Sequence, residues 1–516
     1  MITYTPADPP AVRADGALTL VGPTSGVCTA CAEHARLTVA GAPPHGDLRL
    51  AGLVPPAFRP FVEAVGQLEP GTLLALRTDL ALVSTHRVRP RPGCCPLPEP
   101  RDTTEITGNA LRADNPLTTV ENLTAAVVDH RFGPVTGLFR AGHLPLPTMT
   151  AELHGHGAGH GRTAGFEQAE RVALFEAVER YNGMRPRSHR TTFEASFAEL
   201  GPDHAVDPAA LGLPDHHRYT PNLTFRWVEG WSYTRQRTIA VPEQVAYWDV
   251  ETPPEQRFLH ETSNGCGLGN SLTEAVLHGL FEVAERDAFL MAWYAQTPLR
   301  RIRLPRDPLL HHLTDRLEEL GYELLFLDAT TDIGIPSVLA LARTDRATLP
   351  RAFFAAGASP DPTAALRSAA VEVVVDVESF ADRVRANPGA YDRHRLLRLL
   401  HEPELVRSMD DHVAVNTLPE AADRYAFLVG TGETVLEDHR DHTSLEGLLD
   451  HYSARLRHQG LELVAVDQTD PVTAGGLGLH SAKVLVPGAL PMTFGHRRTA
   501  GLPRLRAKAL HPHPFP

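Results

Sequence analysis

The sequence contains one helical motif twice, and each copy places two glutamates among apolar residues. The first copy is AERVALFEAVERY, residues 169–181, and the second is EAVLHGLFEVAERDAF, residues 274–289. Both share Leu-Phe-Glu followed, after two residues, by Glu-Arg. Residues three apart lie on one face of a helix, so each copy presents a pair of carboxylates. A single copy would indicate a solvated face with intrahelical ion pairs, but the recurrence of the whole apolar frame favours a shared function.

The two pairs together supply four carboxylates, which are Glu176, Glu179, Glu282 and Glu285. Partly buried carboxylates cost several kcal/mol unless they are paired or bind a metal. Two such helices facing each other would suit hard divalent cations such as magnesium, and magnesium in turn suits a nucleoside triphosphate. We therefore expect the four glutamates to hold Mg2+ on ATP.

Each copy follows a glycine-rich stretch, HGHGAGHGRTAG at 154–165 and SNGCGLGN at 263–270. Glycines let a backbone approach a phosphate closely, so we interpret both as candidate phosphate loops. The chain has only two lysines, Lys483 and Lys508, and neither lies in a P-loop context. No Rossmann glycine pattern opens a helix after a strand either. An ATP site would therefore rest on metal held by the glutamates, with Arg180 or Arg286 contacting phosphates.

The segments GHGRTAGFEQAERVALFEAVERY and SNGCGLGNSLTEAVLHGLFEVAERDA resemble the two signature segments of YcaO-domain proteins. The resemblance runs from about residue 105 to the C-terminus and includes VLVPGALPMTFGH at 484–496. It implies an α+β fold that binds ATP and Mg2+ and activates a peptide amide oxygen. It places magnesium on the four glutamates and nucleotide contacts on Ser263, Asn270, Arg286 and Glu372.

Two departures from the family pattern affect the nucleotide site. A polar residue and an arginine expected shortly after Glu372 are here Val375 and Val377, and His160 stands where many members carry lysine. Arginine elsewhere would have to replace the missing cation. We expect Arg367, one helical face from Glu372, or the Arg300–Arg301 pair to do so.

The sequence ends in PHPFP, with Pro512, Pro514 and Pro516 in a Pro-x-Pro-x-Pro pattern. This pattern resembles the terminus of azoline-forming YcaO cyclodehydratases, which makes these prolines candidates for the catalytic segment and the Pro516 carboxylate a candidate base. Prolines fix φ and remove donors, so the segment should be stiff and extended. We expect it to bury little apolar surface, so that its removal leaves stability unchanged. The competing interpretation is a frayed terminus.

Four of the five cysteines occur in two pairs near the N-terminus, Cys28 with Cys31 and Cys94 with Cys95. The segments LVGPTSGVCTAC and HRVRPRPGCCP resemble a reduced form of the zinc-carrying part of the E1-like proteins that work with azoline-forming YcaO enzymes. Pro98 stands where the fourth cysteine of the family pattern is expected. A structural zinc site, with Cys94 or His86 as substitute ligand, and vestigial thiols remain equally open.

Composition indicates a cytoplasmic enzyme with two domains. The formal net charge of -13 argues against a nucleic-acid partner, and MITYTPADPPAV lacks the regions of a secretory signal. No membrane span is expected. Residues 98–118 are rich in turn formers and predict a linker. We therefore divide the chain into a reduced E1-like module at 1–100, of small α/β type, and a mixed α and β YcaO domain at 105–516.

The resemblance implies ATP-dependent cyclodehydration of cysteine, or of serine and threonine, in a ribosomally made precursor peptide of the azole-modified or thiopeptide kind. It also implies a leader sequence on that peptide, a separate E1-like (ThiF-like) protein that binds the leader, an azoline dehydrogenase in the same pathway, and a homodimer. Two other functions stay open. One is thioamide or amidine formation, and the other is a scaffold that binds leader or partner without catalysis.

Overall fold

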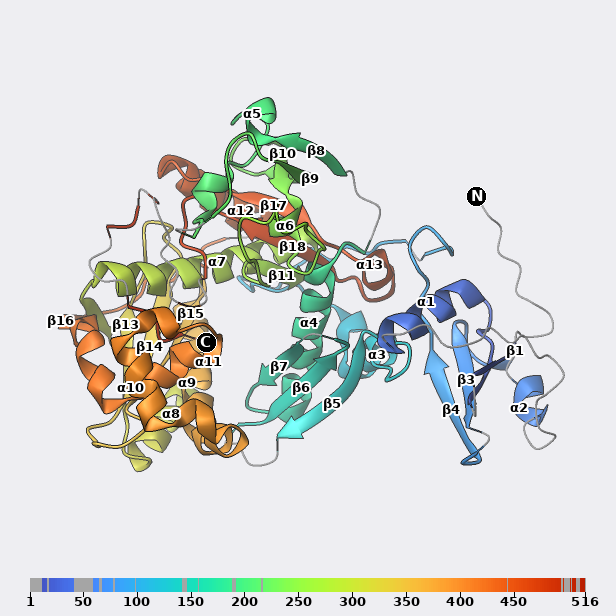
Figure 1. The fold of residues 1–516 in the computed structure, drawn as a ribbon, viewed down its shortest axis with the longest axis horizontal. Coiled ribbons are helices and arrows are strands. Elements are labelled where there is room, and N and C mark those ends of the chain that lie inside the picture. The colour runs from blue at the N-terminus through green and yellow to red at the C-terminus, as the bar shows by residue number, and fades with distance from the viewer. Residues whose placement is uncertain are drawn as a thin grey trace.

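The computed structural model describes residues 12–15, 18–40, 59–64, 67–77, 79–97, 99–141, 146–155, 157–187, 192–214, 217–442, 444–492, 495, 502, 504–506 and 511–515. Helices and strands are both present along the whole described part of the chain, which confirms the mixed fold class. The strands of these residues gather in four sheets (Figure 1). Within the described residues, no helix is both long and apolar enough to cross a membrane.

The N-terminal module is a four-stranded antiparallel sheet in the order β1-β2-β3-β4. The strands are β1 (Val12–Asp15), β2 (Leu18–Val21), β3 (Thr72–Arg77) and β4 (Leu82–Arg87), and the helices are α1 (Thr29–Ala40) and α2 (Arg59–Ala64). Its small core joins Leu20, Leu73 and Ala75 to Cys31 and Cys95. The module lies at one end of the molecule (Figure 1), beside α3 and α4.

The remaining strands form three sheets. The smallest has β5 (Val135–Ala141), β6 (Thr148–Leu153) and β7 (Ala158–Arg162). The second has the order β10 (Arg237–Pro242), β9 (Thr224–Ser232), β17 (Val464–Asp467), β18 (His480–Leu485) and β11 (Cys266–Gly269), with β8 (Thr192–Ser196) pairing to β9. The third has the order β15 (Ala352–Ala358), β14 (Ser337–Arg343), β13 (Glu323–Asp328), β12 (Leu299–Ile302) and β16 (Val429–Thr434).

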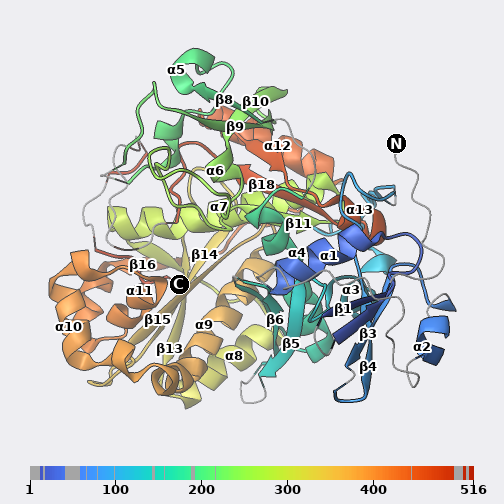
Figure 2. The ribbon, with the colours of Figure 1, turned by 45° about the vertical axis from the view of Figure 1, so that its right-hand side comes forward.

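Helices cover these sheets and connect them. The long ones are α4 (Phe166–Met184), α7 (Leu272–Ala295) and α9 (Pro362–Ala386); the others are α3 (Val120–Val127), α5 (Phe197–Leu200), α6 (Glu243–Ala246), α8 (Pro308–Glu319), α10 (Arg393–His401), α11 (Met409–Asn416), α12 (Leu445–His458) and α13 (Pro471–Leu477). Helix α7 contacts β11 and β18 of one sheet and β14 and β15 of another. It therefore joins two sheets, as Figure 2 shows from a second side.

The sequence explains why α7 is a long buried helix. Ser271 caps its first turn by accepting a hydrogen bond from the Glu274 amide at 3.1 Å. Apolar residues follow on nearly every face, which is typical of a helix surrounded by protein. The helix ends at Gln296, whose positive φ of 49° breaks the helical path.

The glycines that precede each motif helix pack strand against helix, so interpreting them as open phosphate loops was wrong. Gly159 and Gly161 lie in β7, and Gly267 and Gly269 lie in β11. A Cβ on Gly161 would lie 1.7 Å from the carbonyl oxygen of Ala169, and one on Gly267 would lie 2.2 Å from that of Ala275. Only glycine permits such an approach, and both copies use it.

The linker prediction for residues 98–118 is also wrong for the part that the structure describes. Ile106 and Leu111 pack against the core around α7. The Thr103 amide donates to the carbonyl of Asn270 at 2.8 Å, and the Ala113 amide donates to the Glu274 carboxylate at 2.8 Å. Turn-forming residues here belong to an ordered segment that follows the surface of α7 and β11.

The strand and helix packing predicts a steep cost for one added methyl group. Gly267→Ala should lower the free energy of unfolding by about 2 kcal/mol or more, because its Cβ would overlap the Ala275 carbonyl. Gly476→Ala is the matched control, since no atom lies within 4 Å of a Cβ there. Urea unfolding of both variants measures the difference, and equal stability would contradict the packing described.

Candidate active site

The two motif helices bring their glutamates together, and we call the half-buried site formed by Glu176, Glu179, Glu282 and Glu285 the cleft. Helix α4 contacts β11, the strand that leads into α7, and both views of the fold show the two side by side (Figure 1, Figure 2). Glu179 of α4 lies close enough to Glu282 of α7 for their charges to repel. The structure thus places both carboxylate pairs at a single location, as the sequence predicts. Their role as magnesium ligands stays a prediction.

On α4, arginine and backbone groups orient the first carboxylate. One oxygen of Glu176 pairs with Arg180 at 2.6 Å, and the other accepts a hydrogen bond from the His160 amide of β7 at 2.5 Å. Arg180 also donates to the Ala158 carbonyl at 2.7 Å. Strand β7 therefore fixes both members of the pair, and burial lowers the pKa of its His160 side chain.

On α7, one arginine faces both carboxylates. Arg286 lies 3.6 Å from an oxygen of Glu282 and 3.8 Å from one of Glu285. Glu282 also accepts a hydrogen bond from the Gly265 amide at 2.9 Å. Burial disfavours the charged form of Arg286, but the charges of Glu285 and Glu282 outweigh it and raise the pKa of Arg286.

A fifth carboxylate comes from α9. Glu372 lies near Glu285 and Arg286, and Arg162 of β7 approaches it at 3.9 Å. Val375 and Val377, one turn later, are buried in the core beneath α9. Positions 375 and 377 are valines because this face of α9 packs against the core.

The arginines expected to replace the missing family cation are engaged elsewhere. Arg367 pairs with Asp307, Arg300 with Asp328 and Arg301 with Glu323. Whether any of them contacts a nucleotide stays a prediction. Arg162 is the arginine that approaches Glu372. Its position at the end of the short strand β7 gave no periodic signal in the sequence.

The cleft raises the pKa of its carboxyl groups. Burial, with the charges of Glu282 and Glu176, raises the pKa of Glu179 well above its usual value. Burial and the neighbouring Glu285 raise the pKa of Glu372 to about 7. The side chains of Glu176, Glu282 and Glu285 nevertheless keep 18–29% of their surface exposed. These carboxylates are only partly neutralised by neighbouring arginines, and they remain accessible to solvent. Both properties suit a bound divalent cation, so this donor set fits magnesium.

The loop that carries Ser263 is held by one of the two lysines. Lys483 of β18 is buried, and its ammonium group donates to the carbonyls of Thr262 at 3.1 Å and Asn264 at 2.5 Å. Glu261 approaches the same group at 3.5 Å. The lysine thus binds the backbone on both sides of Ser263, which fixes the loop at the end of the cleft next to Glu282.

Asn270, predicted to contact nucleotide, is fully buried in the framework of the cleft. Its amide donates to the Ala113 carbonyl at 2.9 Å, and its oxygen accepts from Asn115 at 2.9 Å. Both ends of the amide therefore bind protein groups. The structure gives Asn270 a supporting position and leaves Ser263, Arg180, Arg286 and Glu372 at the cleft.

A buried glutamate and a half-buried arginine near the cleft were missed by the sequence analysis. Glu274, in the first turn of α7, pairs with Arg112 at 3.1 Å. Arg112 in turn lies close enough to Glu179 to stabilise its charge. In the sequence, only the charge of Glu274 inside the apolar start of α7 pointed to this ion pair. Its partner Arg112 lies more than 160 residues earlier, so spacing could not reveal it.

The Pro-x-Pro segment is anchored in the core, which contradicts the expectation that it buries little surface. Phe515 is 1% exposed and stacks on Phe289 of α7 with ring centroids 3.6 Å apart. Pro512 and Pro514 are buried as well. Trp293, one turn beyond Phe289, donates to the His511 carbonyl at 2.9 Å. Pro516 lies outside the described residues.

A histidine of α11 holds the same segment. The Nδ1 of His412 donates to the His513 carbonyl at 2.8 Å, while its Nε2 accepts from the Gly495 amide at 2.9 Å. This arrangement requires the neutral ring, and burial lowers the pKa of His412 accordingly. The two rings stack at 4.2 Å.

The four paired cysteines form one cluster in the N-terminal module. Their sulfur atoms all lie within 4.8 Å of one another, with Cys28 3.6 Å from Cys31 and 3.4 Å from Cys94. Cys31 and Cys95 lie 3.7 Å apart. Sulfurs around a tetrahedral zinc at about 2.3 Å would be about 3.8 Å apart, so the cluster fits zinc.

Backbone amides point at these sulfurs. The amide of Cys28 donates to the Cys95 sulfur at 3.3 Å, and that of Arg91 donates to the Cys31 sulfur at 3.2 Å. Burial opposes ionisation of Cys28, but the Cys31 amide and the neighbouring thiols lower its pKa to about 7. Both cysteine pairs contribute sulfurs to the cluster. Pro98, where the family pattern has a cysteine, lies outside the described residues.

His86, considered as a substitute ligand, lies away from the cysteines. Its Nδ1 contacts both oxygens of Asp129 at 3.0 Å, and its Nε2 contacts the Ser84 hydroxyl at 2.7 Å. That expectation is therefore wrong. His86 instead joins β4 to the segment between α3 and β5.

Comparison with known proteins agrees with this geometry. Residues 160–490 match the family model described as "YcaO cyclodehydratase, ATP- and Mg2+-binding". An uncharacterised protein in the tfuA 3′ region of Rhizobium leguminosarum bv. trifolii is 29% identical over 341 residues, 62% of this chain and 74% of that protein.

Two solved structures share the fold over nearly the whole chain. One is a heterocyclase in complex with substrate and cofactor, with TM-score 0.70 and 23% identity over 95% of this chain and 74% of the other. The second is the heterocyclase TruD, with TM-score 0.66 and 20% identity over 98% of this chain and 74% of that one. The family match covers well over half of the sequence, including both glutamate helices, and the chain therefore belongs to the YcaO cyclodehydratase family.

Proposed function

We propose that this protein is an ATP-dependent cyclodehydratase that converts cysteine residues of a ribosomally made precursor peptide to thiazolines, with serine or threonine as alternative substrates that would give oxazolines. One observation carries the proposal: two Glu-x-x-Glu-Arg helices meet in a cleft whose carboxyl groups have raised pKa values. The family match to ATP- and magnesium-binding cyclodehydratases supports it. The likeness to heterocyclases supports the fold that such chemistry needs.

In this proposal Glu176, Glu179, Glu282 and Glu285 hold Mg2+, which would neutralise charge on the ATP phosphates. Arg180 and Arg286 orient those carboxylates and contact phosphate oxygens. Ser263, on the loop fixed by Lys483, and Glu372 complete the nucleotide site. Asn270 supports it through Asn115 and Glu274.

The reaction begins when the side-chain sulfur or oxygen of the substrate residue attacks the preceding amide carbon and loses its proton to a base. The resulting tetrahedral adduct carries an oxygen that leaves poorly. That oxygen takes the γ-phosphoryl group of ATP, which releases ADP. The amide nitrogen then loses its proton and forms the C=N bond as phosphate departs and the ring closes. The chain's part is to hold both reactants in line and to exclude water.

The segment around Pro512 and Pro514 supports azoline formation over thioamide formation. It packs against α7, the helix that carries Glu282 and Glu285, through the Phe289 and Phe515 stack. This anchoring holds the last described residue at a fixed point, so that the Pro516 carboxylate acts as the base in our proposal. A non-catalytic scaffold would need neither feature.

We further propose that residues 1–100 form a reduced E1-like module with a structural zinc bound by Cys28, Cys31, Cys94 and Cys95. The module is small, so leader recognition comes mainly from a separate E1-like partner, and an azoline dehydrogenase oxidises the product. Residues 105–516 form the catalytic domain. Homodimer formation is part of the same proposal.

Glu282→Gln should abolish ATP consumption and ring formation, because it removes one charge from the metal site. The variant should remain folded, since burial already disfavours the charged form of this side chain. Phosphate release with precursor peptide and partner measures the effect. Glu167→Gln, on the exposed first turn of α4, is the control with the same change. Ring formation at the wild-type rate in Glu282→Gln, or a thioamide product from the wild-type enzyme, would contradict the proposal.

Removing Pro516 alone should separate chemistry from folding. The deletion leaves the Phe515 anchor in place but shifts the terminal carboxylate by about 3 Å, which should lower the cyclisation rate on the order of a hundredfold. The melting temperature should stay unchanged.

Phe515→Ala should instead lower the free energy of unfolding by about 3 kcal/mol, because it empties a buried site, whereas Phe193→Ala on exposed β8 should cost little. Normal cyclisation after deletion of Pro516 would contradict a chemical role.

Purified protein should carry zinc in the cysteine cluster. Metal analysis should find the ion in wild type and in Cys266→Ala, since Cys266 lies in β11, and should find none in the Cys28→Ser, Cys31→Ser variant. Metal loss should also destabilise the small module, whose core includes two of the four cysteines. Wild-type protein prepared without chelator that contains no zinc would support vestigial thiols.

A further inference from the structure

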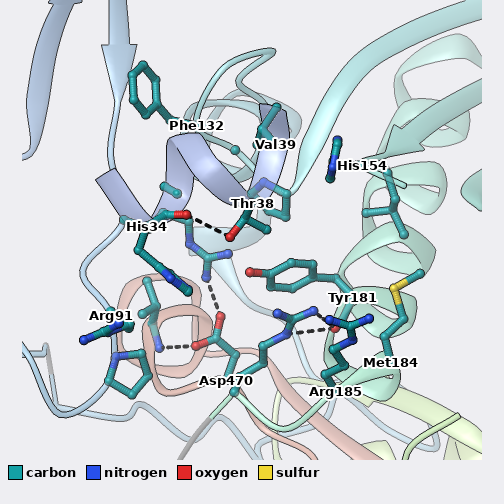
Figure 3. A pocket seen from close by; sticks show the side chains of 18 of the residues that line it. His34, Thr38, Val39, Arg91, Phe132, His154, Tyr181, Met184, Arg185 and Asp470 are labelled. Carbon is teal, nitrogen blue, oxygen red and sulfur yellow. Dashed lines mark hydrogen bonds and ion pairs between the residues drawn. The ribbon is translucent and has the colours of Figure 1, made fainter. Parts of the chain in front are cut away.

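A cavity of about 510 Å3 lies between the N-terminal module and the catalytic domain, outside the carboxylate cleft. Figure 3 shows His34 and Arg91 on one side and Tyr181, Met184 and Arg185 on the other. The first side comes from α1 and the segment after β4, and the second comes from the end of α4. Asp470 closes one end.

Positive charge is concentrated in this cavity although the chain is acidic overall. Four arginines line it, Arg89, Arg91, Arg185 and Arg187, against two aspartates, Asp249 and Asp470. Arg89 pairs with Asp470 at 2.6 Å and Arg185 with Asp249 at 3.0 Å, so both aspartates are already neutralised. A surplus of two positive charges remains in a protein with a net charge of -13.

The two surplus arginines face the same histidine. Arg91 is exposed and forms no ion pair with any residue that the structure describes. Arg187 donates to the Tyr181 carbonyl at 2.7 Å and stacks on the Tyr181 ring at 3.5 Å, which fixes its guanidinium without neutralising it. Burial first, and then the charges of Arg91 and Arg187, lower the pKa of His34. The local potential is therefore positive around His34.

The walls also carry apolar surface, from Val39, Pro90, Phe132 and Met184. A small inorganic anion would leave this surface uncovered, and the volume exceeds what such an ion needs. A short peptide with alternating acidic and apolar side chains would satisfy both the guanidinium groups and the apolar walls.

The position relative to the cleft identifies the source of such a peptide. Tyr181 and Met184 continue α4 beyond Glu176 and Glu179, so cavity and cleft lie within about two turns of one helix, roughly 12 Å. An extended chain spans that distance in about four residues. We propose that the cavity binds an acidic segment of the precursor peptide, while a neighbouring segment of the same peptide enters the cleft. Naming the precursor as the source rests on the proposed function.

Fluorescence anisotropy with a labelled peptide of alternating glutamate and leucine tests the cavity directly, without ATP. The probe should bind wild type, lose affinity as salt is added, and bind Arg91→Glu on the order of tenfold more weakly. His34→Glu, on the same wall as Arg91, should weaken binding as well. Arg398→Glu is the control, because it makes the same charge change on exposed α10.

Three results would overturn the proposal: equal binding of a lysine and leucine peptide, an equal loss in Arg398→Glu, or displacement of the probe by millimolar phosphate alone. Glu282→Gln should bind the probe as wild type does. Probe binding by Glu282→Gln tests the cavity, and the loss of ring formation in that variant tests the cyclodehydratase function. One of the two proposals can therefore fail while the other stands.

Discussion

Two close contacts between a glycine strand and a helix determine where the four motif glutamates of the cleft lie. In each, a strand with glycine at alternate positions presses its backbone onto an alanine carbonyl of the following helix. The contact sets the height and rotation of α4 and α7, and the two motif glutamates of each helix lie three residues apart on one face. Because β11 belongs to a different sheet from β7 yet touches α4, the two units meet at the cleft. A side chain at Gly161 or Gly267 would displace the helix that carries the carboxylates.

The carboxylates of the cleft repel one another, yet hydrogen bonds hold them in fixed positions. Carboxyl groups whose pKa values are raised destabilise the fold in their charged forms, and arginines offset this in part. Arg180 and Arg286 each lie on the same helix as the glutamates they contact, so these ion pairs do not join one helix to the other. The constraint comes from groups that do not titrate in the cleft, such as the amides of His160 and Gly265. Backbone amides thus fix the positions of the carboxylates, and the negative charge of the carboxylates remains available to bind a cation.

Sequence reasoning reached the parts of the site that recur within the sequence, and missed those that depend on contacts between distant segments. The repeated glutamate frame predicted two facing helices, and the two cysteine pairs suggested a zinc site that the sequence left as open as vestigial thiols. Arg112 and Arg162 could not be assigned, because their carboxylate partners lie on helices far along the chain. The glycines were misread, since a strand that packs on a helix and a loop that binds phosphate need the same residue for the same steric reason. The Pro-x-Pro segment was judged from its prolines, whereas Phe515 determines where it lies.

The arrangement of α7 has a consequence for how the protein is made. Its environment is completed by β17, β18, Arg504 and Phe515, which are synthesised about two hundred residues after the helix itself. Arg504 binds Asp287 of α7 at 2.8 Å, an aspartate that is otherwise buried. During translation the helix therefore emerges with an apolar surface and acidic groups that still lack partners. Such long-range dependence slows folding and leaves the nascent chain prone to association, so the environment of the carboxylate cleft is complete only after Phe515 has been synthesised.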